Sequence, residues 1–221
     1  MRIVFFGSPQ FAAKHLDFLN KKGLNIISVV TAPDKQKGRG KKIIGTDVKI
    51  KSQELDIKTF TPDNLQELNF ISNLKELNAD LFVVVAFRML PKEVWTIPKM
   101  GTINLHTSLL PNYRGAAPIN RVLINGEKHT GVTTFFINEK IDCGEIIQQE
   151  RIELTEDTTA GQLYNLLMDS GCKNLYSTIK KIKFNKCNPI IQDNSLAINK
   201  APKITKKLSK INWSEEARPI H

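Results

Sequence analysis

Cysteine is scarce in this chain of 221 residues. Its three cysteines, Cys143, Cys172 and Cys187, are odd in number and form no C-x-x-C pair. This pattern excludes a disulfide-stapled secreted scaffold and offers no zinc-ligand spacing, so we expect a reduced, cytoplasmic protein that binds no metal. Long apolar runs are absent as well, since no stretch of about 20 apolar residues occurs. We therefore expect no membrane partner.

Glycine is missing where a dinucleotide-binding protein needs it. The first apolar segment ends at Gly7, but Pro9 stands where the second glycine of a G-x-G-x-x-G fingerprint would be. Those glycines let the backbone approach a pyrophosphate at a helix N-terminus. The strand–helix beginning of the chain therefore does not indicate NAD.

Positive charge, in contrast, is plentiful, with a formal net charge of +10. A basic balance favours a polyanionic partner, but scattered lysines on solvated faces would raise the charge without any binding role. Clustering is more informative. Residues 32–45 lack apolar periodicity, and their basic side chains are those of Lys35, Lys37, Arg39, Lys41 and Lys42. This loop is either a solvated connection or an arm that binds nucleic acid.

Apolar segments alternate with amphipathic ones along most of the chain, which is typical of an α/β fold built on a parallel sheet. We predict strands at residues 3–7, 25–31, 58–60, 81–86, 101–106, 130–137 and 145–152. The predicted helices lie between residues 9 and 23 and at 46–55, 64–77, 91–95, 118–125 and 158–182, with a small hairpin at 189–198. We assign residues 1–200 to one domain and the polar, basic residues 201–221 to a linker or tail.

Two polar side chains stand two residues apart in the apolar segment 101–106. Residues i and i+2 of a strand point to the same face, so Asn104 and His106 project together while Ile103 and Leu105 face the other way. The strand ends at His106, and open α/β sheets bind their ligands at the carboxyl ends of such strands. The pair is therefore a candidate catalytic site.

Three motifs together resemble the folate-dependent formyltransferases. They are Asn104-x-His106 followed by Ser108-Leu109-Leu110-Pro111 and the segment 113–118; the D-x-G element Asp142-Cys143-Gly144; and Pro33-Asp34 with the loop 38–42. The first two are typical of formyltransferases in general, whereas the third is typical of the tRNA-directed branch. The resemblance covers essentially the whole chain as a Rossmann-like catalytic domain, with a mostly parallel twisted sheet flanked by helices.

This resemblance implies transfer of a formyl group from 10-formyltetrahydrofolate to an amine, which in the tRNA-directed branch is that of initiator methionyl-tRNA in translation initiation. The catalytic group would be Asn104, His106 and Asp142. The folate would contact Ser108, Leu109, Leu110 and Pro111, with its pterin near Arg88, Met89 and Leu90. The basic loop would contact tRNA phosphates, Arg39 foremost because guanidinium fits phosphate in a forked geometry.

Several alternatives remain at the level of the sequence. Glycinamide ribonucleotide and nucleotide-sugar formyltransferases share the Asn-x-His and Asp motifs, and a non-catalytic RNA- or folate-binding module is an alternative of another class. The basic loop and the segment after Lys200 favour the tRNA-directed branch. Members of that branch carry a second, barrel-like C-terminal domain, which we expect to be absent from this chain, and we expect a monomer.

Overall fold

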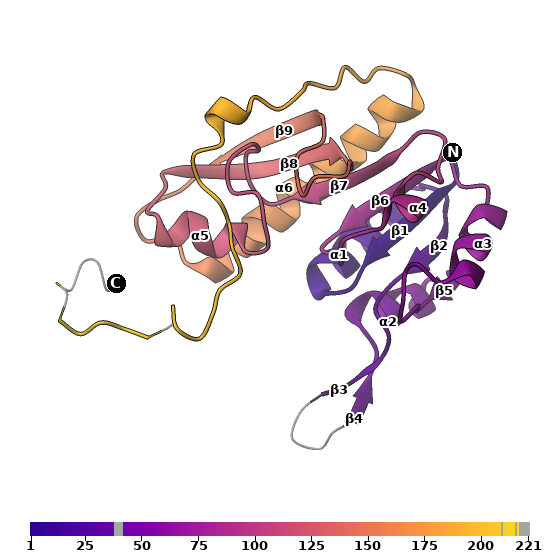
Figure 1. The fold of residues 1–221 in the computed structure, drawn as a ribbon, viewed down its shortest axis with the longest axis horizontal. Coiled ribbons are helices and arrows are strands. Elements are labelled where there is room, and N and C mark those ends of the chain that lie inside the picture. The colour runs from indigo at the N-terminus through magenta and orange to yellow at the C-terminus, as the bar shows by residue number, and fades with distance from the viewer. Residues whose placement is uncertain (38–41, 209, 215, 217–221) are drawn as a thin grey trace.

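A seven-stranded sheet forms the centre of the structure, a computed structural model that describes residues 1–37, 42–208, 210–214 and 216. Its first five strands in spatial order are parallel: β5 (Thr59–Phe60), β2 (Ile26–Val30), β1 (Ile3–Gly7), β6 (Leu81–Val85) and β7 (Thr102–His106). The last two, β8 (His129–Phe136) and β9 (Ile146–Glu153), pair antiparallel. The predicted mostly parallel α/β sheet is confirmed (Figure 1).

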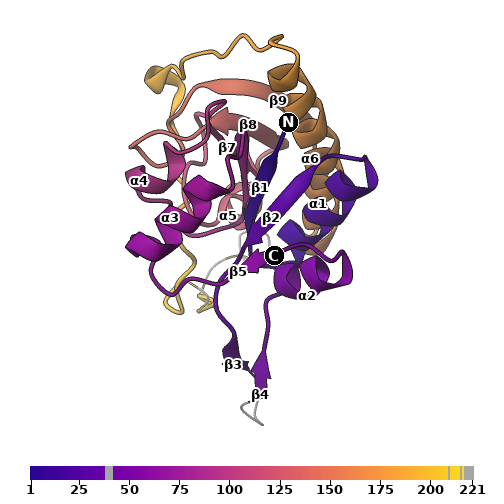
Figure 2. The ribbon, with the colours of Figure 1, turned by 90° about the vertical axis from the view of Figure 1, so that its right-hand side faces the viewer.

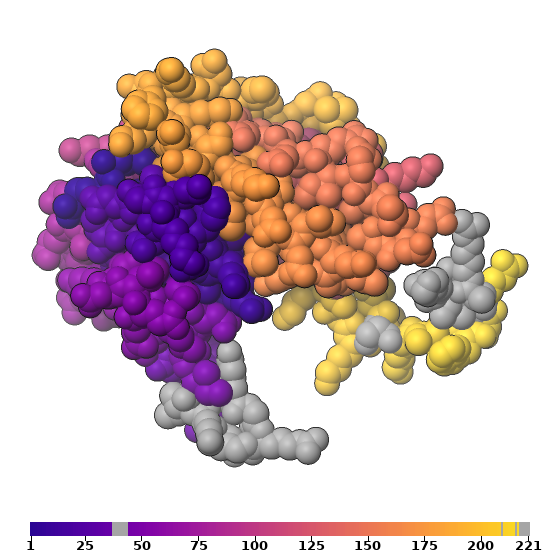
Figure 3. Space-filling view, turned by 180° about the vertical axis from the view of Figure 1, so that it is seen from behind, coloured from indigo at the N-terminus to yellow at the C-terminus, as the bar shows by residue number. Residues whose placement is uncertain are grey.

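Helices cover both faces of this sheet because alternate strand residues form two separate apolar cores. Phe5, Val83 and Ile103 belong to the core beneath α1 (Gln10–Lys21), α2 (Asp47–Glu54), α5 (Pro118–Ile124) and α6 (Ala160–Lys183). Phe6 and Val84 belong to the core beneath α3 (Leu68–Glu76) and α4 (Lys92–Trp95). Figure 3 shows α1, in indigo, beside α6, in orange, on the outer surface of the helices that cover the first of these cores.

Local sequence explains where the longest helix begins. The Thr159 hydroxyl accepts a hydrogen bond from the backbone N–H of Gln162, whose own side chain accepts one from the Thr159 N–H. This capping box satisfies two backbone donors that the first helical turn leaves free. Among the described residues, no helix is both long and apolar enough to cross a bilayer.

Two segments differ from the prediction. The expected irregular loop contains an antiparallel hairpin of β3 (Lys35–Lys37) and β4 (Lys42–Ile44), which projects from the body in Figure 2. Backbone pairing between projecting strands requires no apolar face, so the hairpin leaves no periodicity in the sequence. The predicted hairpin at 189–198 is wrong, because Ile190 pairs with Ile146 at the start of β9 instead.

The segment 189–201, called the strap below, runs from the start of β9 to α5 (Figure 1). It includes the short 3₁₀ helix η1 (Asn194–Leu196) and ends at Ala201, which is fully buried. The Ala201 N–H donates to the carbonyl of Arg114 at 2.8 Å, and its carbonyl accepts from the Ala117 N–H at 3.1 Å. The strap thus becomes part of the folded body.

Candidate active site

A cavity of about 820 Å³ opens at the carboxyl ends of β6 and β7. Val84, Asn104 and Phe135 are paired neighbours on three adjacent strands, and all three line it. Most of its remaining wall is apolar, with Leu90 and Trp95 among the contributors. The cavity therefore combines an apolar enclosure with a few convergent polar groups, as ligand sites of enzymes do.

Asn104 is the polar member of the row of neighbours on β6, β7 and β8. It is half-buried between two side chains, Val84 and Phe135, that are nearly inaccessible to solvent. Within the described part of the chain its side-chain amide makes no hydrogen bond. Its NH₂ group is consequently available to donate to a molecule in the cavity.

His106 is buried at the end of the same strand and is oriented by the backbone of the following loop. Its Nε2 lies 2.8 Å from the carbonyl oxygen of Tyr113. A carbonyl can only accept, so Nε2 carries the hydrogen and donates it. The other ring nitrogen, Nδ1, lies 3.8 Å from Oδ2 of Asp142. The sequence motif therefore brings Asn104, His106 and Asp142 to one cavity.

Asp142 occupies the turn between β8 and β9, with a left-handed backbone at φ 52°. Its Oδ2 accepts a hydrogen bond of 2.9 Å from the N–H of Gly115. The glycine of the D-x-G element is needed because a Cβ on Gly144 would lie 1.6 Å from the carbonyl oxygen of Phe136. Close packing of the turn on the end of β8 thus sets the position of the carboxylate.

The loop that holds His106 is itself anchored through the phenol of Tyr113. Its hydroxyl donates to Glu127 and accepts hydrogen bonds from Asn125 at 2.9 Å and Asn199 at 3.2 Å. Burial, together with the adjacent Glu127 carboxylate, raises the pKa of Tyr113 to about 12. Tyr113 therefore remains a protonated donor over the physiological pH range, and its carbonyl stays aimed at His106.

The predicted folate residues fall into two groups. Arg88, Met89 and Leu90 line the 820 Å³ cavity. The guanidinium of Arg88 also donates to the carbonyls of Pro62 and Asp63, and Met89 is largely exposed at the cavity's surface.

The other predicted folate residues, Ser108 to Pro111, do not line the cavity, whereas the preceding Thr107 does. Their backbone is held from behind by Thr133, whose hydroxyl donates to the Ser108 carbonyl and accepts from the Leu110 N–H. Gln149 adds a 2.8 Å hydrogen bond to the Leu110 carbonyl. The backbone of Ser108 to Pro111 is thus fixed by hydrogen bonds next to the cavity, outside its wall.

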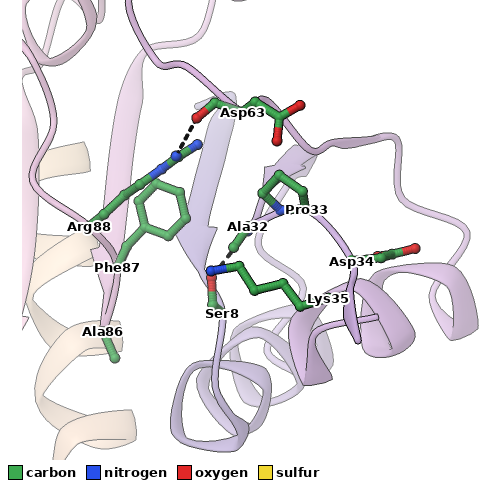
Figure 4. A pocket seen from close by; sticks show the side chains of 9 residues that line it. All are labelled: Ser8, Ala32, Pro33, Asp34, Lys35, Asp63, Ala86, Phe87 and Arg88. Atoms are coloured by element: carbon green, nitrogen blue, oxygen red, sulfur yellow. Dashed lines mark hydrogen bonds between the residues drawn. The ribbon is translucent and has the colours of Figure 1, made fainter. Parts of the chain in front are cut away.

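A second cavity of about 410 Å³ adjoins the first and shares Ala86, Phe87 and Arg88 with it. Figure 4 shows its other walls, formed by the ends of β1 and β2, by Asp63 and by Lys35 at the base of the β3–β4 hairpin. Through Lys35, the base of the hairpin thus lines a cavity that adjoins the one containing the catalytic candidates. Of that loop, Arg39 and Lys41 lie outside the described residues, and Lys37 and Lys42 are described only as backbone of the hairpin strands.

Sequence reasoning did not identify Gly115 as a site residue. Its N–H is what holds Asp142, and at φ 125° a Cβ would lie 2.6 Å from the carbonyl oxygen of Ala201. The signal available in the sequence is only a glycine inside the 113–118 motif, which does not disclose a partner 27 residues away. No grouping of three or more His, Cys, Asp or Glu side chains suited to a metal ion occurs in the described ranges.

The site as a whole suits nucleophilic addition to a carbonyl group. It offers an amide donor on Asn104 that no described residue engages, a ring nitrogen on His106 that faces the carboxylate of Asp142, and that carboxylate itself. A donor stabilises the oxyanion that forms on addition, and the imidazole can carry the proton lost by the nucleophile.

Comparisons with known proteins agree with this chemistry. A family model described as formyl transferase matches residues 1–179. The methionyl-tRNA formyltransferase of Flavobacterium johnsoniae is 45% identical over 221 residues, covering 100% of this chain and 70% of that protein.

Two of the solved structures that share the fold are also named as formyltransferases. An N-formyltransferase from Helicobacter canadensis, in complex with folinic acid and dTDP-3-aminofucose, superposes with a TM-score of 0.71 at 22% identity, covering 99% of this chain and 77% of that chain. Phosphoribosylglycinamide formyltransferase from Streptococcus pneumoniae gives a TM-score of 0.70 at 15% identity, covering 82% and 98%.

Proposed function

The chain belongs to the formyl transferase family, and within it to the methionyl-tRNA formyltransferases, and on this premise we propose that it formylates the α-amine of initiator methionyl-tRNA with 10-formyltetrahydrofolate. The observation that carries the proposal is the convergence of Asn104, His106 and Asp142 on one cavity. The reaction would serve translation initiation in the cytoplasm.

The first step is attack of the amine nitrogen on the formyl carbon. An α-amine has a reference pKa of about 7.7–8.0, so roughly a tenth of it is already neutral near pH 7 and activation is a modest demand. A C–N bond forms, and the formyl oxygen takes the electron pair. The side-chain amide of Asn104 donates a hydrogen bond to that oxygen. One such donor stabilises the transition state by about 3–4 kcal/mol.

Collapse of the tetrahedral intermediate completes the transfer. The attached nitrogen loses a proton to Nδ1 of His106, the ring nitrogen not engaged by Tyr113. The oxygen then re-forms its double bond, the bond from carbon to N10 of the folate breaks, and N10 takes the proton that Nδ1 of His106 received from the amine, which returns the ring to its neutral form. Asp142, 3.8 Å from Nδ1, stabilises the positive charge while His106 holds that proton.

In this proposal the folate lies in the larger cavity, against the predicted group that lines it and next to the predicted group that does not. Its pterin lies against Arg88, Met89 and Leu90, which line the cavity, and Ser108 to Pro111 form the supported border beyond Thr107. The formyl group is thereby directed at Asn104. The folinic acid bound by the Helicobacter canadensis relative supports a folate-type co-substrate.

The identity of the acceptor rests on the relatives and on the basic hairpin. Lys35 is exposed at the wall of the second cavity, and the hairpin's strands carry Lys37 and Lys42 with Arg39 and Lys41 between them. Lysine and arginine that neutralise phosphates supply most of the sequence-independent affinity for nucleic acid. We propose that this hairpin lies along the acceptor stem while the methionyl end enters the cavity.

The decisive experiment offers the purified chain 10-formyltetrahydrofolate with either methionyl-tRNA or glycinamide ribonucleotide. The expected product is formylmethionine, recovered from the tRNA after deacylation. Turnover of glycinamide ribonucleotide alone would reject the proposed acceptor while retaining formyl transfer. Binding of folate or tRNA with no turnover of either amine would favour a binding module.

A further inference from the structure

The turn that carries Asp142 is held from outside the sheet by a glutamine of the strap. Gln192 is 6% exposed, and its Nε2 donates to the carbonyls of Asp142 at 2.9 Å and Gly144 at 2.7 Å. Among the described residues, neither Asp142 nor Gly144 pairs with a strand, and the neighbouring Ile141 is largely exposed. Two hydrogen bonds from one buried side chain therefore connect the backbone of this turn to the strap.

The other end of the same side chain is bound to the loop that orients His106. The Oε1 of Gln192 accepts from Nε of Arg114 at 3.0 Å and from Nη2 at 2.6 Å. Arg114 lies between Tyr113, whose carbonyl accepts from His106, and Gly115, whose N–H donates to Asp142. One amide group thus joins both loops that position the acid and the imidazole.

We propose that Gln192 is a positioning residue for formyl transfer, which sets the distance between Asp142 and His106 by tying the D-x-G turn to the 113–115 loop. The inference rests on the proposed function, because it gives Gln192 a role only through the two catalytic candidates. All four hydrogen bonds need a neutral amide, since one end donates to carbonyls and the other accepts from a guanidinium. A displacement of about 1 Å at a reacting group can lower the rate by about 100-fold.

The test is the Gln192→Glu variant of the full chain. A glutamate keeps the contact to Arg114 as an ion pair, so the strap stays anchored, but it cannot donate to the two carbonyls of the turn. The expected result is a kcat lower by up to about 100-fold with a nearly unchanged KM for 10-formyltetrahydrofolate. Asn194→Ala is the matched control, because it removes only the 3.0 Å contact to Nη1 of Arg114 and should retain the wild-type kcat.

A double-mutant cycle separates positioning from a general structural effect. In an Asp142→Ala background, Gln192→Glu should reduce the residual activity by no more than about 2-fold, because the group through which Gln192 acts is gone. Equal losses in both backgrounds, or a wild-type kcat for the single variant, would overturn the proposal. Gln192→Met, which also cannot donate, replaces the glutamate variant in the same cycle if the latter does not fold.

A failure of the Gln192 proposal can be told apart from a failure of the proposed function. Wild-type protein is first assayed with both amines, and the Gln192 comparison is then made with whichever amine it formylates. If the protein formylates only the other amine, the tRNA assignment is rejected. The role of Gln192 is then tested by the same comparison of kcat with that amine.

Discussion

His106 donates a 2.8 Å hydrogen bond from Nε2 to the backbone carbonyl of Tyr113. This contact decides which ring nitrogen exchanges protons. Because Nε2 carries the hydrogen of this bond, Nδ1 is the ring nitrogen left for the site, and it is the atom 3.8 Å from Asp142. The chemistry of the site therefore depends on a backbone carbonyl as much as on the side chains of the motif.

Replacing His106 by alanine should lower kcat far more than it lowers folate affinity. General acid–base catalysis contributes about 100- to 10,000-fold, whereas the residues proposed to contact the pterin, Arg88, Met89 and Leu90, line another part of the cavity wall. Steady-state kinetics with methionyl-tRNA measures kcat, and calorimetric titration with a folate analogue measures affinity. Wild-type turnover would remove His106 from the mechanism.

Asn104→Ala should reduce kcat by about 100- to 1,000-fold, the effect of deleting one oxyanion donor. The fold should tolerate the change, because the amide makes no hydrogen bond within the described residues and its removal leaves no partner unsatisfied. Single-turnover rates with bound substrates isolate the chemical step, and thermal unfolding checks the stability. A loss confined to KM would show that Asn104 binds substrate uniformly instead of stabilising the oxyanion.

Removing positive charge from the hairpin should weaken tRNA binding and its dependence on salt. Arg39→Ala or Lys35→Ala should each reduce the slope of log affinity against log salt concentration by roughly 1 if the residue neutralises one phosphate. Filter binding at several salt concentrations provides the slope. Lys75→Ala removes the same charge from the solvent-exposed side of helix α3 and is the matched control. An unchanged slope for both hairpin variants would leave the hairpin as a solvated projection.

Acid should destabilise the fold through His15, which is fully buried on α1. Burial lowers its pKa from 6.5 to about 4, opposed by its hydrogen bond to the Phe11 carbonyl. Between these two values the unfolded chain binds the proton more readily than the folded chain, so stability is present above pH 6.5 and falls as the pH drops to 4. This loss amounts to about 3 kcal/mol.

Urea unfolding of wild type and His15→Leu at pH 7 and pH 4 measures this contribution. The carboxylates titrate in both proteins, so the difference between their two pH dependences isolates His15. The leucine variant should lose less stability on acidification. Equal losses would contradict the assignment of the acid sensitivity to this buried ring.

The order and type of most elements followed from local sequence. Continuous apolar segments predicted the central strands, and the two-residue spacing predicted that Asn104 and His106 share a face, because side-chain direction in a strand depends only on its period. The hairpin β3–β4 was missed because it projects from the body. Neither of its faces needs to be apolar, so no alternating pattern marks its strands.

The sequence by itself determined the α/β sheet, the position of the Asn-x-His pair at a strand end, and the presence of a basic segment. Only the tertiary structure decided that Nδ1 of His106 faces Asp142 and that Gly115 holds the carboxylate. It also decided that Gln192, fifty residues after Asp142 in the chain, donates to the backbone of the Asp142 turn. Periodicity is local and can be read along a strand. Hydrogen bonds between distant loops depend on how the elements pack, and that packing is a property of the whole chain.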